Sequence, residues 1–471
     1  GPTDADRDPR SGRHARADPG GRGPAGGARK DAGLFRTRCV CMLRPVKPPL
    51  LIAESANPEW FSVPLVGWSH ARALQRAVGG HLVTQIRNAS AFERAGVDPA
   101  DYTAIDSEKV ARRVHALGAA FGRASGKGWT ARMALSAVSY EYFERLVWKA
   151  FGPRIRAGEF SVVHRVTPLS PTLPSPIAVR CAQAGVPFVW GPINGGVPWP
   201  RDFDRERRRE GEWLSYIRGA YRFLPGYLST RRCASAIICG SRHTAQEVPP
   251  RYADRVVYVP ENAVDPERFT LQRTRKATVP LRCMFLGRLV PYKGCDMLLQ
   301  AAAALVRAGK LSIEVVGDGP ERARLERMAR ELDIVPGVRF AGKVPHTEVQ
   351  RHLAESDLLT FPSIREFGGG VILEAMAVGV PPMAVAYGGP GELMTDATSY
   401  PIPIGSRPEV VSRLRSALEK VVADPSGIDV RGEAAKERVR RLFTWEAKAR
   451  QTIQVYRWVL GERDKPAFDF G

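Results

Sequence analysis

Short apolar segments alternate with helical patterns along most of this 471-residue chain. This alternation restricts the fold more than any other feature, because strands that alternate with helices form parallel sheets covered on both faces. In the first half the apolar segments begin with PPLLIAES at Pro48 and recur at 160–164, 187–190, 235–239 and 255–259. Helical patterns are clearest at 65–78, 107–122 and 129–151.

A second alternation follows a polar stretch at 270–280, which we interpret as an interdomain linker. Its predicted strands are 281–286, 311–316, 338–341, 357–361 and 382–386, and its predicted helices are 294–308, 320–333, 346–355, 370–378 and 407–423. A basic helical stretch at 432–460 ends the pattern. We therefore predict an α/β protein with two Rossmann-like doubly wound parallel-sheet domains that face each other across a cleft, where such sheets bind ligands.

Charge and composition limit the class of protein. Seventy Lys and Arg face 49 Asp and Glu, which gives a net charge of +21. Such a field favours an anionic partner, namely nucleic acid, an acidic membrane or a phosphorylated substrate, although a composition rich in solvated Arg explains it equally well. No apolar run reaches the roughly 18 residues of a membrane span. Residues 1–41, rich in Gly, Pro and Arg, are expected to be a disordered tail.

The seven cysteines are scattered and complete no metal site, so we expect a reduced, cytoplasmic protein without a bound metal. Neither a signal peptide nor a nucleic-acid-binding motif is recognisable, and we expect no nucleic-acid partner.

Two segments of the second half carry features of an anion site. FLGRLVPYKG, at 285–294, delivers Gly287, Arg288 and Lys293 at the end of a strand, and two cations beside a glycine turn suit a diphosphate. VVGDGPERARLE, at 315–326, places Gly317 in a strand-to-helix turn, which we interpret first as structural.

REFGGGVILEAMAVGVP, at 365–381, combines a loop carboxylate, three glycines and a helical carboxylate. Glycines let a ligand approach the backbone, and a helix N-terminus offers free amides to an anion. Along a helix, Glu366 and Glu374 would lie roughly 12 Å apart, about the length that separates the two polyol ends of a sugar nucleotide. Each carboxylate can accept several hydrogen bonds from hydroxyls. An isolated pair of this kind would be interpreted as solvated surface.

The combined segments resemble the retaining glycosyltransferases of family 4, which have the two-Rossmann B-type fold. The matching segments, in the family's order, are FLGRLVPYKG, VVGDGP, VRFAGKVP, REFGGGVILEAMAVGVP and YGGPGEL. VVYVPENAVDPERF, at 256–269, is also similar, with Ala263 where the family usually has Gly.

The resemblance implies a role for each matching residue. Arg288 and Lys293 would hold the donor diphosphate, Glu366 the sugar hydroxyls, and Glu374 the ribose. Lys343 and Val344 would lie near the base. Further donor contacts would come from Gly287, Gly317, Phe367, Gly368, Gly369 and Gly370. It also implies domains at 42–272 and 276–445, with a C-terminal helix, about 446–471, that returns to the first domain.

The first half matches the family less well. His164 fits one of two usual histidine positions near the donor sugar, and Val166 occupies the other, so His164 is a catalytic candidate with a structural alternative. Asn194 and Gly195 lie in a glycine-rich loop, WGPINGGVPWP, that would shape the acceptor side or serve only as a rigid loop. Gly67 is the single glycine where the family often has a pair.

We therefore predict a metal-independent transfer of a sugar from a nucleoside-diphosphate sugar, UDP in preference to GDP, to an unknown acceptor hydroxyl with retention of configuration. No cofactor is expected. A sugar-nucleotide epimerase or phosphorylase on the same fold and a basic nucleic-acid-binding protein are the alternatives. Arg and aromatic residues interleave at 129–156 and 213–232, which suggests a peripheral contact with an anionic membrane at its inner face, or simply core packing. Cell-envelope, glycolipid and natural-product glycans are the expected products.

Overall fold

The computed structural model describes residues 47–108, 128–209, 222 and 225–471. Strands from the first half form a seven-stranded sheet in the order β3-β2-β1-β4-β5-β6-β7, and every neighbouring pair is parallel. The strands are β1 (Leu50–Ala53), β2 (His81–Gln85), β3 (Tyr102–Ile105), β4 (Val163–Thr167), β5 (Phe188–Ile193), β6 (Ala236–Cys239) and β7 (Val256–Tyr258).

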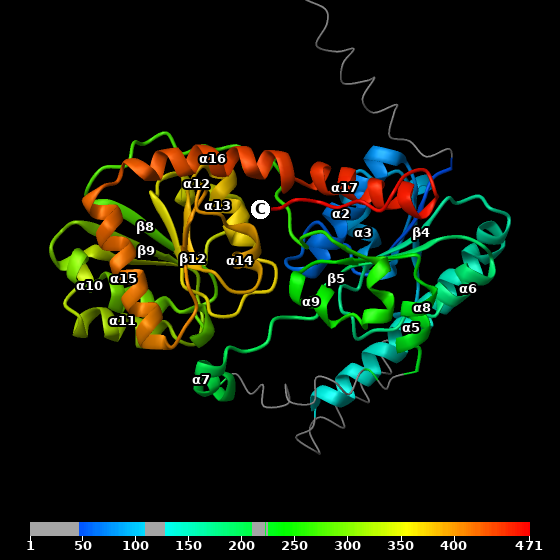
Figure 1. Cartoon of the computed structure of the whole chain (residues 1–471), viewed down its shortest axis with the longest axis horizontal. Coiled ribbons are helices and arrows are strands. Elements are labelled where there is room, and N and C mark those ends of the chain that lie inside the picture. Colours follow the sequence, from blue (N-terminus) through cyan, green and yellow to red (C-terminus); the bar gives the residue numbers. More distant parts are fainter. Residues whose placement is uncertain (1–46, 109–127, 210–221, 223–224) are drawn as a thin grey trace, which may run out of the picture. The chain divides into compact units, whose positions relative to one another are not determined.

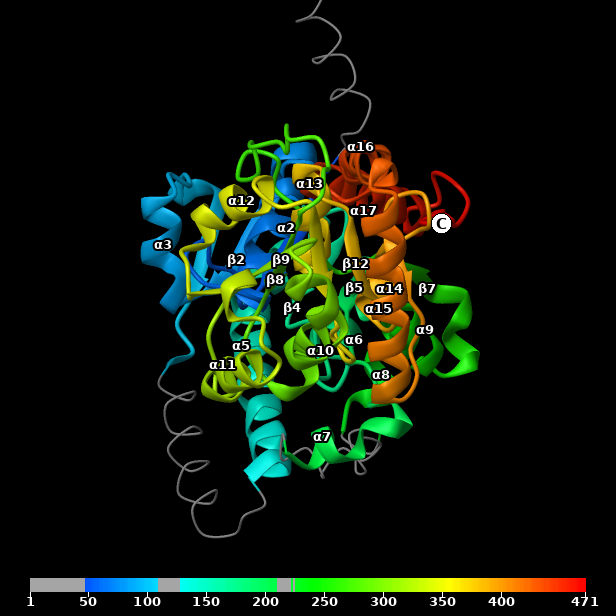
Figure 2. The same ribbon diagram turned by 90° about the vertical axis from the view of Figure 1, so that its left-hand side faces the viewer.

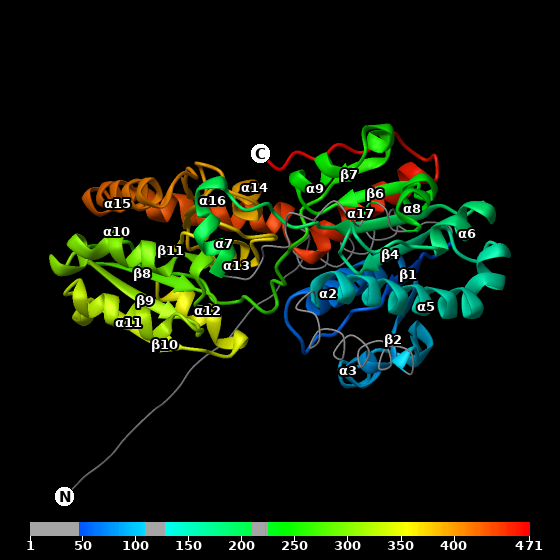
Figure 3. The same ribbon diagram turned by 90° about the horizontal axis from the view of Figure 1, so that it is seen from below.

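Helices cover both faces of this sheet because both faces are apolar. In β1, Leu50 and Ile52 face one hydrophobic cluster, while Leu51 and Ala53 face the other. The first cluster includes residues of α5 (Gly128–Arg156) and α6 (Ile177–Gln183), and the second includes α2 (Val63–Val78) and the last helix, α17 (Trp445–Val459). Figure 1 shows α17, in red, next to α2, in blue, and Figure 3 shows α5 beside the strands of the same sheet. Short helices complete this half: α3 (Ala89–Arg94), α8 (Tyr227–Cys233) and α9 (Arg242–Glu247). Another short helix, α7 (Asp204–Arg209), comes from the same part of the sequence but contacts the second half, where Glu206 pairs with Arg407.

The second sheet has six parallel strands in the order β10-β9-β8-β11-β12-β13. These are β8 (Leu281–Leu286), β9 (Leu311–Val316), β10 (Val338–Gly342), β11 (Leu358–Phe361), β12 (Pro382–Val385) and β13 (Tyr400–Ile402). The accompanying helices are α10 (Cys295–Arg307), α11 (Arg322–Glu331), α12 (His346–Ala354), α13 (Gly370–Val378), α14 (Gly389–Leu393), α15 (Arg407–Ala423) and α16 (Ser426–Leu442). Figure 2 shows α10 and α15 side by side in front of these strands.

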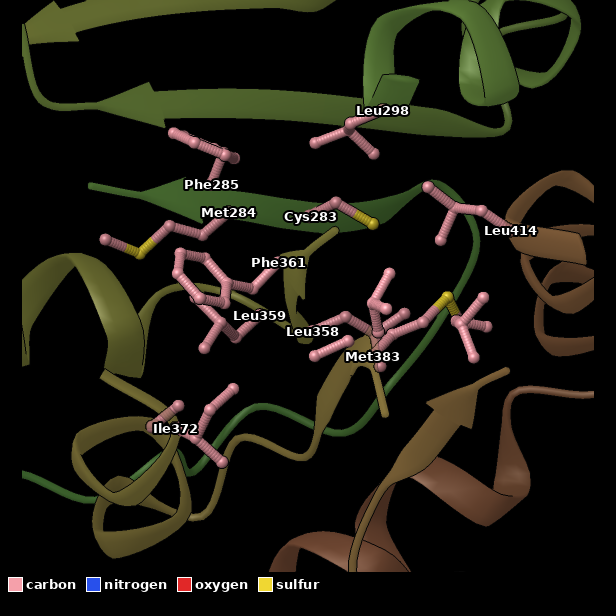
Figure 4. Close-up of a cluster of buried hydrophobic side chains, with 14 of the residues drawn as sticks. Cys283, Met284, Phe285, Leu298, Leu358, Leu359, Phe361, Ile372, Met383 and Leu414 are labelled. Atoms are coloured by element: carbon pink, nitrogen blue, oxygen red, sulfur yellow. The ribbon is translucent and has the colours of Figure 1, made fainter. Parts of the chain in front are cut away.

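The core of the second sheet is built from aliphatic, aromatic and sulfur-containing side chains. Figure 4 shows Cys283 and Phe285 of β8 near Leu298 of α10, and Phe361 of β11 among its neighbours. Cys283 and Cys295 are buried and free, and they pack as small core residues.

A strap from the first half, residues 197–206, is built into this second core. Trp199 and Phe203 belong to the hydrophobic cluster of the second sheet, and Phe203 is fully buried. Arg365 Nε donates to the carbonyl of Val197 at 3.0 Å, and Tyr387 Oη donates to the carbonyl of Pro198 at 3.0 Å. The strap therefore ties the segment after β5 to the loops that follow β11 and β12.

The chain end also joins elements that are distant in sequence. Phe470 is buried in the cluster of the second sheet and stacks on Phe443, with ring centroids 5.9 Å apart. Its ring also contacts Tyr258 of β7, at 5.4 Å. The last residues thus fill the space between β7 and the junction of α16 with α17.

The structure differs from the predicted elements in one helix and three strands. The stretch 432–460 is interrupted, because α16 ends at Leu442 and the Thr444 side chain accepts a hydrogen bond from Ala447 N, at 3.1 Å, to begin α17. Strands β2, β3 and β13 were not predicted. Most of the predicted helix 107–122, and the tail at 1–41, lie outside the described residues. None of the described helices is long and apolar enough to cross a membrane.

Candidate functional site

A cavity of about 630 Å³ is lined by loops that follow strands of both sheets. The first half contributes the β1–α2 loop, the segment after β4, the loop after β5 and the segment after β7. The second half contributes the Gly-rich turn before α13, together with His346, and α17 contributes Trp445. The carboxyl edges of parallel sheets therefore meet the cavity, which is where open α/β sheets bind ligands.

Glu366 lines the cavity, and its carboxylate forms an ion pair with Lys293. Lys293 ends the loop after β8, and Gly294, at φ 73°, separates it from the first residue of α10, Cys295. The Lys293 ammonium also lies 5.0 Å from the centre of the Phe361 ring. Two residues predicted independently for the diphosphate and the sugar are thus in direct contact, and each is largely buried.

Glu374, in the middle of α13, also lines the cavity. Its Oε1 lies 3.0 Å from Nε2 of His346, the first residue of α12. The His346 ring in turn makes edge contacts with Phe61 and Phe269, at 6.2 and 5.7 Å between centroids. His346, which directly follows the Lys343-Val344-Pro345 loop, was not predicted as a site residue.

The Gly-rich turn brings backbone to the cavity. Gly368 and Gly370 line it, and a Cβ at Gly368 would lie 1.9 Å from Nδ2 of Asn262, so a side chain there would displace the Asn262 amide. Gly369 has a φ of 61° and precedes the first turn of α13. The exposed ring of Phe367 lines the cavity beside Gly196.

Gly287 and Gly317 lie where the ends of β8 and β9 meet. A Cβ on Gly317 would lie 1.9 Å from the carbonyl oxygen of Gly287, and Gly287 N donates to the carbonyl of Val316 at 3.0 Å. These two glycines permit close backbone packing, which agrees with the structural interpretation of the turn at 317; a donor contact stays a prediction.

Seven of the predicted donor residues do not line the cavity: Gly287, Arg288, Lys293, Gly317, Lys343, Val344 and Gly369. Arg288 and Lys343 are exposed, and Val344 is half-buried. Arg288 and Val344 follow β8 and β10 at the carboxyl edge of the second sheet. Their donor contacts stay predictions.

His164 lies in the interior of the first half. It is fully buried, with Nδ1 2.6 Å from Oη of Tyr456 and Nε2 2.6 Å from the carbonyl oxygen of Gly191. Burial lowers the pKa of His164 to about 4. The ring thus links β4 to α17 and does not line the cavity, which favours the structural alternative; a catalytic role stays a prediction.

Gly67 is also a packing residue. It lies on α2, where a Cβ would meet the carbonyl oxygen of Ser55 at 2.1 Å. The helix can therefore approach β1 only with glycine at this position, and Gly67 does not line the cavity.

The acceptor-side candidates Asn194 and Gly195 do line the cavity. Asn194 Nδ2 donates to Oε2 of Glu261 at 2.5 Å, and Gly195 N donates to Oγ1 of Thr244 at 2.8 Å. Glu261, Asn262 and Trp445 also line the cavity and were not predicted as site residues. Their segment, VVYVPENAVDPERF, was recognised only as a similarity.

Within the described part of the chain, no three His, Cys, Asp or Glu side chains gather as metal ligands would. Metal independence stays a prediction.

Two parallel-sheet α/β halves with a shared cavity define the class, the GT-B fold of glycosyltransferases, and this confirms the predicted fold. A glycosyltransferase from Rickettsia africae ESF-5 superimposes with a TM-score of 0.57 at 13% identity, covering 89% of this chain and 100% of that one. Anabaena Alr3699/HepE in complex with UDP gives 0.53 at 15% identity, covering 86% and 98%.

Sequence comparison finds relatives of the second half. Residues 268–437 match the family described as glycosyl transferases group 1, which agrees with the predicted resemblance to glycosyltransferases. The glycogen synthase of Mycobacterium tuberculosis (strain CDC 1551 / Oshkosh) is 30% identical over 201 residues, 42% of this chain and 48% of that protein. The 2-deoxystreptamine glucosyltransferase of Streptomyces kanamyceticus is 30% identical over 221 residues, 45% and 56%. The chain thus spans about half the length of these relatives.

Proposed function

We propose that this chain is a retaining glycosyltransferase of the family 4 type, which transfers a sugar from a nucleoside-diphosphate sugar to an acceptor hydroxyl. The observation that carries the proposal is the placement of Glu366 and Glu374 in one cavity, on either side of the Gly-rich turn. The family match at 268–437 includes this turn and the loop of Arg288 and Lys293. A UDP-sugar is the expected donor, and the UDP bound to the Anabaena protein of the same fold supports this choice.

In this proposal each residue acts on a different part of the donor. Glu374 binds the ribose, with His346 holding its carboxylate. Glu366 accepts hydrogen bonds from the sugar hydroxyls. Lys293, which pairs with Glu366, binds the diphosphate, and Arg288 joins it from the β8 loop. The free amides at the start of α13 add to this positive potential.

Charge builds on the diphosphate as the bond to the anomeric carbon lengthens. Preorganised cations and amides that stabilise this charge are usually the largest catalytic contribution. The acceptor oxygen bonds to the anomeric carbon on the face that the leaving phosphate vacates, and the leaving phosphate oxygen takes the acceptor proton. Configuration is then retained, no metal is required, and Glu366 orients the sugar without acting as a nucleophile.

The test is a panel of UDP-, GDP- and ADP-glucose, scored by thermal shift and by slow hydrolysis without acceptor. We expect UDP-glucose to stabilise the protein and to be hydrolysed in the presence of EDTA. An absence of both effects with every sugar nucleotide would contradict the proposed function. The anomeric configuration of a product, read by NMR, tests retention, and an inverted linkage would refute it.

We also propose a cytoplasmic location with a peripheral electrostatic contact to anionic membrane. The net charge of +21 supports this contact. In the described part of α5, however, Tyr140, Phe143 and Phe151 are buried in the core, so these aromatics offer no membrane face.

A further inference from the structure

Glu261 is a cavity carboxylate that the donor scheme does not use. It follows β7 at the carboxyl edge of the first sheet, and its backbone N donates to the carbonyl of Gly240 at 3.0 Å. It therefore belongs to the first half, whereas the predicted donor carboxylates, Glu366 and Glu374, come from the second.

Asn194 fixes one oxygen of this carboxylate. Its Nδ2 donates to Oε2 of Glu261 at 2.5 Å. Its Oδ1 accepts from Oγ of Ser241 at 3.3 Å and from the backbone N of Gly196 at 3.3 Å. Because donors surround the amide oxygen, the amide nitrogen must face Glu261. The carboxylate is held in one orientation with a single oxygen engaged.

The other oxygen faces the Gly-rich turn. Oε1 of Glu261 lies 3.5 Å from the point that a Cβ on Gly368 would occupy. Gly368 is two residues from Glu366. Burial is the main cause that raises the pKa of Glu261, and the negative charge of Glu366 raises it further. Glu261 and Glu366 thus approach the same space from opposite halves of the chain.

A buried cation lies behind Glu261. Lys448 of α17 is 2% exposed, and its Nζ has no hydrogen-bond partner among the described residues. Its charge lowers the pKa of Glu261 and so opposes the effect of burial. The Lys448 charge also acts on His70 and lowers its pKa, in addition to the effect of burial. The rings of His70 and His164 lie 6.1 Å apart between centroids. Lys448 therefore helps to keep Glu261 ionised and able to accept hydrogen bonds.

We propose that Glu261, oriented by Asn194, is the acceptor subsite and accepts hydrogen bonds from the ring hydroxyls of a polyol, a sugar or cyclitol without an acidic group beside the reacting hydroxyl. This rests on the proposed glycosyl transfer. Glu261 binds the acceptor and takes no proton from it. Glu366 and Glu374 are the cavity carboxylates proposed for the donor, so Glu261, beside the acceptor-side candidate Asn194, is left for the acceptor. The carboxylates of Glu261, Glu366 and Glu374 line the cavity together with one arginine, Arg268, and this excess of negative charge disfavours an anionic acceptor.

The test compares Glu261→Gln, which keeps the shape but removes the charge, with the unchanged chain. Acceptor kinetics are measured with UDP-glucose and with 2-deoxystreptamine, myo-inositol and glucose as probes, beside UDP affinity and acceptor-free hydrolysis. A hydrogen bond to a charged group accounts for about a 10- to 100-fold change in affinity. We expect the acceptor kcat/KM to fall by about that factor, mainly through KM, while UDP affinity and hydrolysis stay within about twofold.

Two further variants complete the design. Asn194→Ala leaves the carboxylate in place but unoriented, and should lower the acceptor kcat/KM by a smaller factor. Glu267→Gln is the matched control, because Glu267 is exposed in the same segment and does not line the cavity. An equal loss of UDP affinity and transfer in Glu261→Gln, or unchanged acceptor kinetics, would overturn the acceptor assignment. Failure of the unchanged chain to bind or hydrolyse any sugar nucleotide would instead refute the proposed function.

Discussion

Lys293 and Glu366 form an ion pair at the place where we expect the donor, so substitution of Lys293 tests the proposed diphosphate site. Lys293→Ala should lower kcat with UDP-glucose by about 100- to 1000-fold, as for the removal of one oxyanion-type donor. The same change at Arg288 should have an effect of similar direction. Hydrolysis and transfer rates measure both.

Lys310→Ala is the control, since Lys310 is exposed in the turn before β9, at the opposite edge of the sheet. Unchanged turnover in Lys293→Ala would refute the assignment of Lys293 to the diphosphate.

Lys448 predicts a pH-dependent stability. Burial lowers its pKa to about 7, from an unfolded value near 10.5, and the charge of Glu261 only partly offsets this. Between these values the unfolded chain binds more protons, so stability rises with pH from about 7 to about 10, by at most about 5 kcal/mol. Below pH 7 Lys448 is protonated in the folded and in the unfolded chain, so the folded state carries the full free-energy cost of burying the ammonium.

The measurement is urea unfolding across this pH range for the unchanged chain and for Lys448→Met. We expect the variant to be more stable at neutral pH and to lose the rise that Lys448 causes. A parallel pH profile for the two proteins would show that Lys448 does not titrate in this window.

At the scale of elements, the β1–α2 loop stores backbone strain. Ser62, at the start of α2, has φ 64° and ψ −135°, a conformation that favours glycine, and it lines the cavity. Ser62→Gly should raise the free energy of unfolding by about 1 kcal/mol. Ser69→Gly, within α2, should lower it by about the same amount. Urea unfolding measures both, and a loss of stability in Ser62→Gly would contradict the strain.

The strap gives a second prediction at this scale. Phe203→Ala should lower the free energy of unfolding by about 3–5 kcal/mol, because a fully buried ring leaves a cavity in the second core. Leu228→Ala, at an exposed position, is the control and should change it by less than about 0.5 kcal/mol. Equal effects in the two variants would show that the strap does not contribute to that core.

Which elements the sequence could predict depended on burial. Strands β8 and β9 were predicted with the observed bounds, because each is a mostly apolar segment of six residues that is followed by a clear helical pattern. β2, β3 and β13 were missed since each is short or interrupted by polar residues or proline, and two of them lie at sheet edges.

Glu366 and Glu374 could be predicted from a local motif. His346 and Glu261 could not, because their contacts with Glu374 and Asn194 join segments distant in sequence.

At the scale of the molecule, the net charge of +21 is the property most open to experiment. We expect the protein to sediment with phosphatidylserine vesicles at low salt and to be released at high salt, because screening weakens electrostatic attraction. Phosphatidylcholine vesicles are the control. Binding to both lipids at high salt would indicate an apolar contact, and no binding at low salt would remove the membrane contact.

Recombination of glycosyltransferases by exchanging whole halves assumes that the joint lies in the polar linker at 270–280. In this chain such a chimera would carry a mismatched core, because Trp199 and Phe203 come from the half upstream of the joint and Phe470 from the far end of the chain. A workable exchange must transplant the second sheet together with residues 197–206 and the last residues of the chain. In this chain the second core is therefore built from three discontinuous pieces of sequence, and a chimera would need all three to keep that core intact.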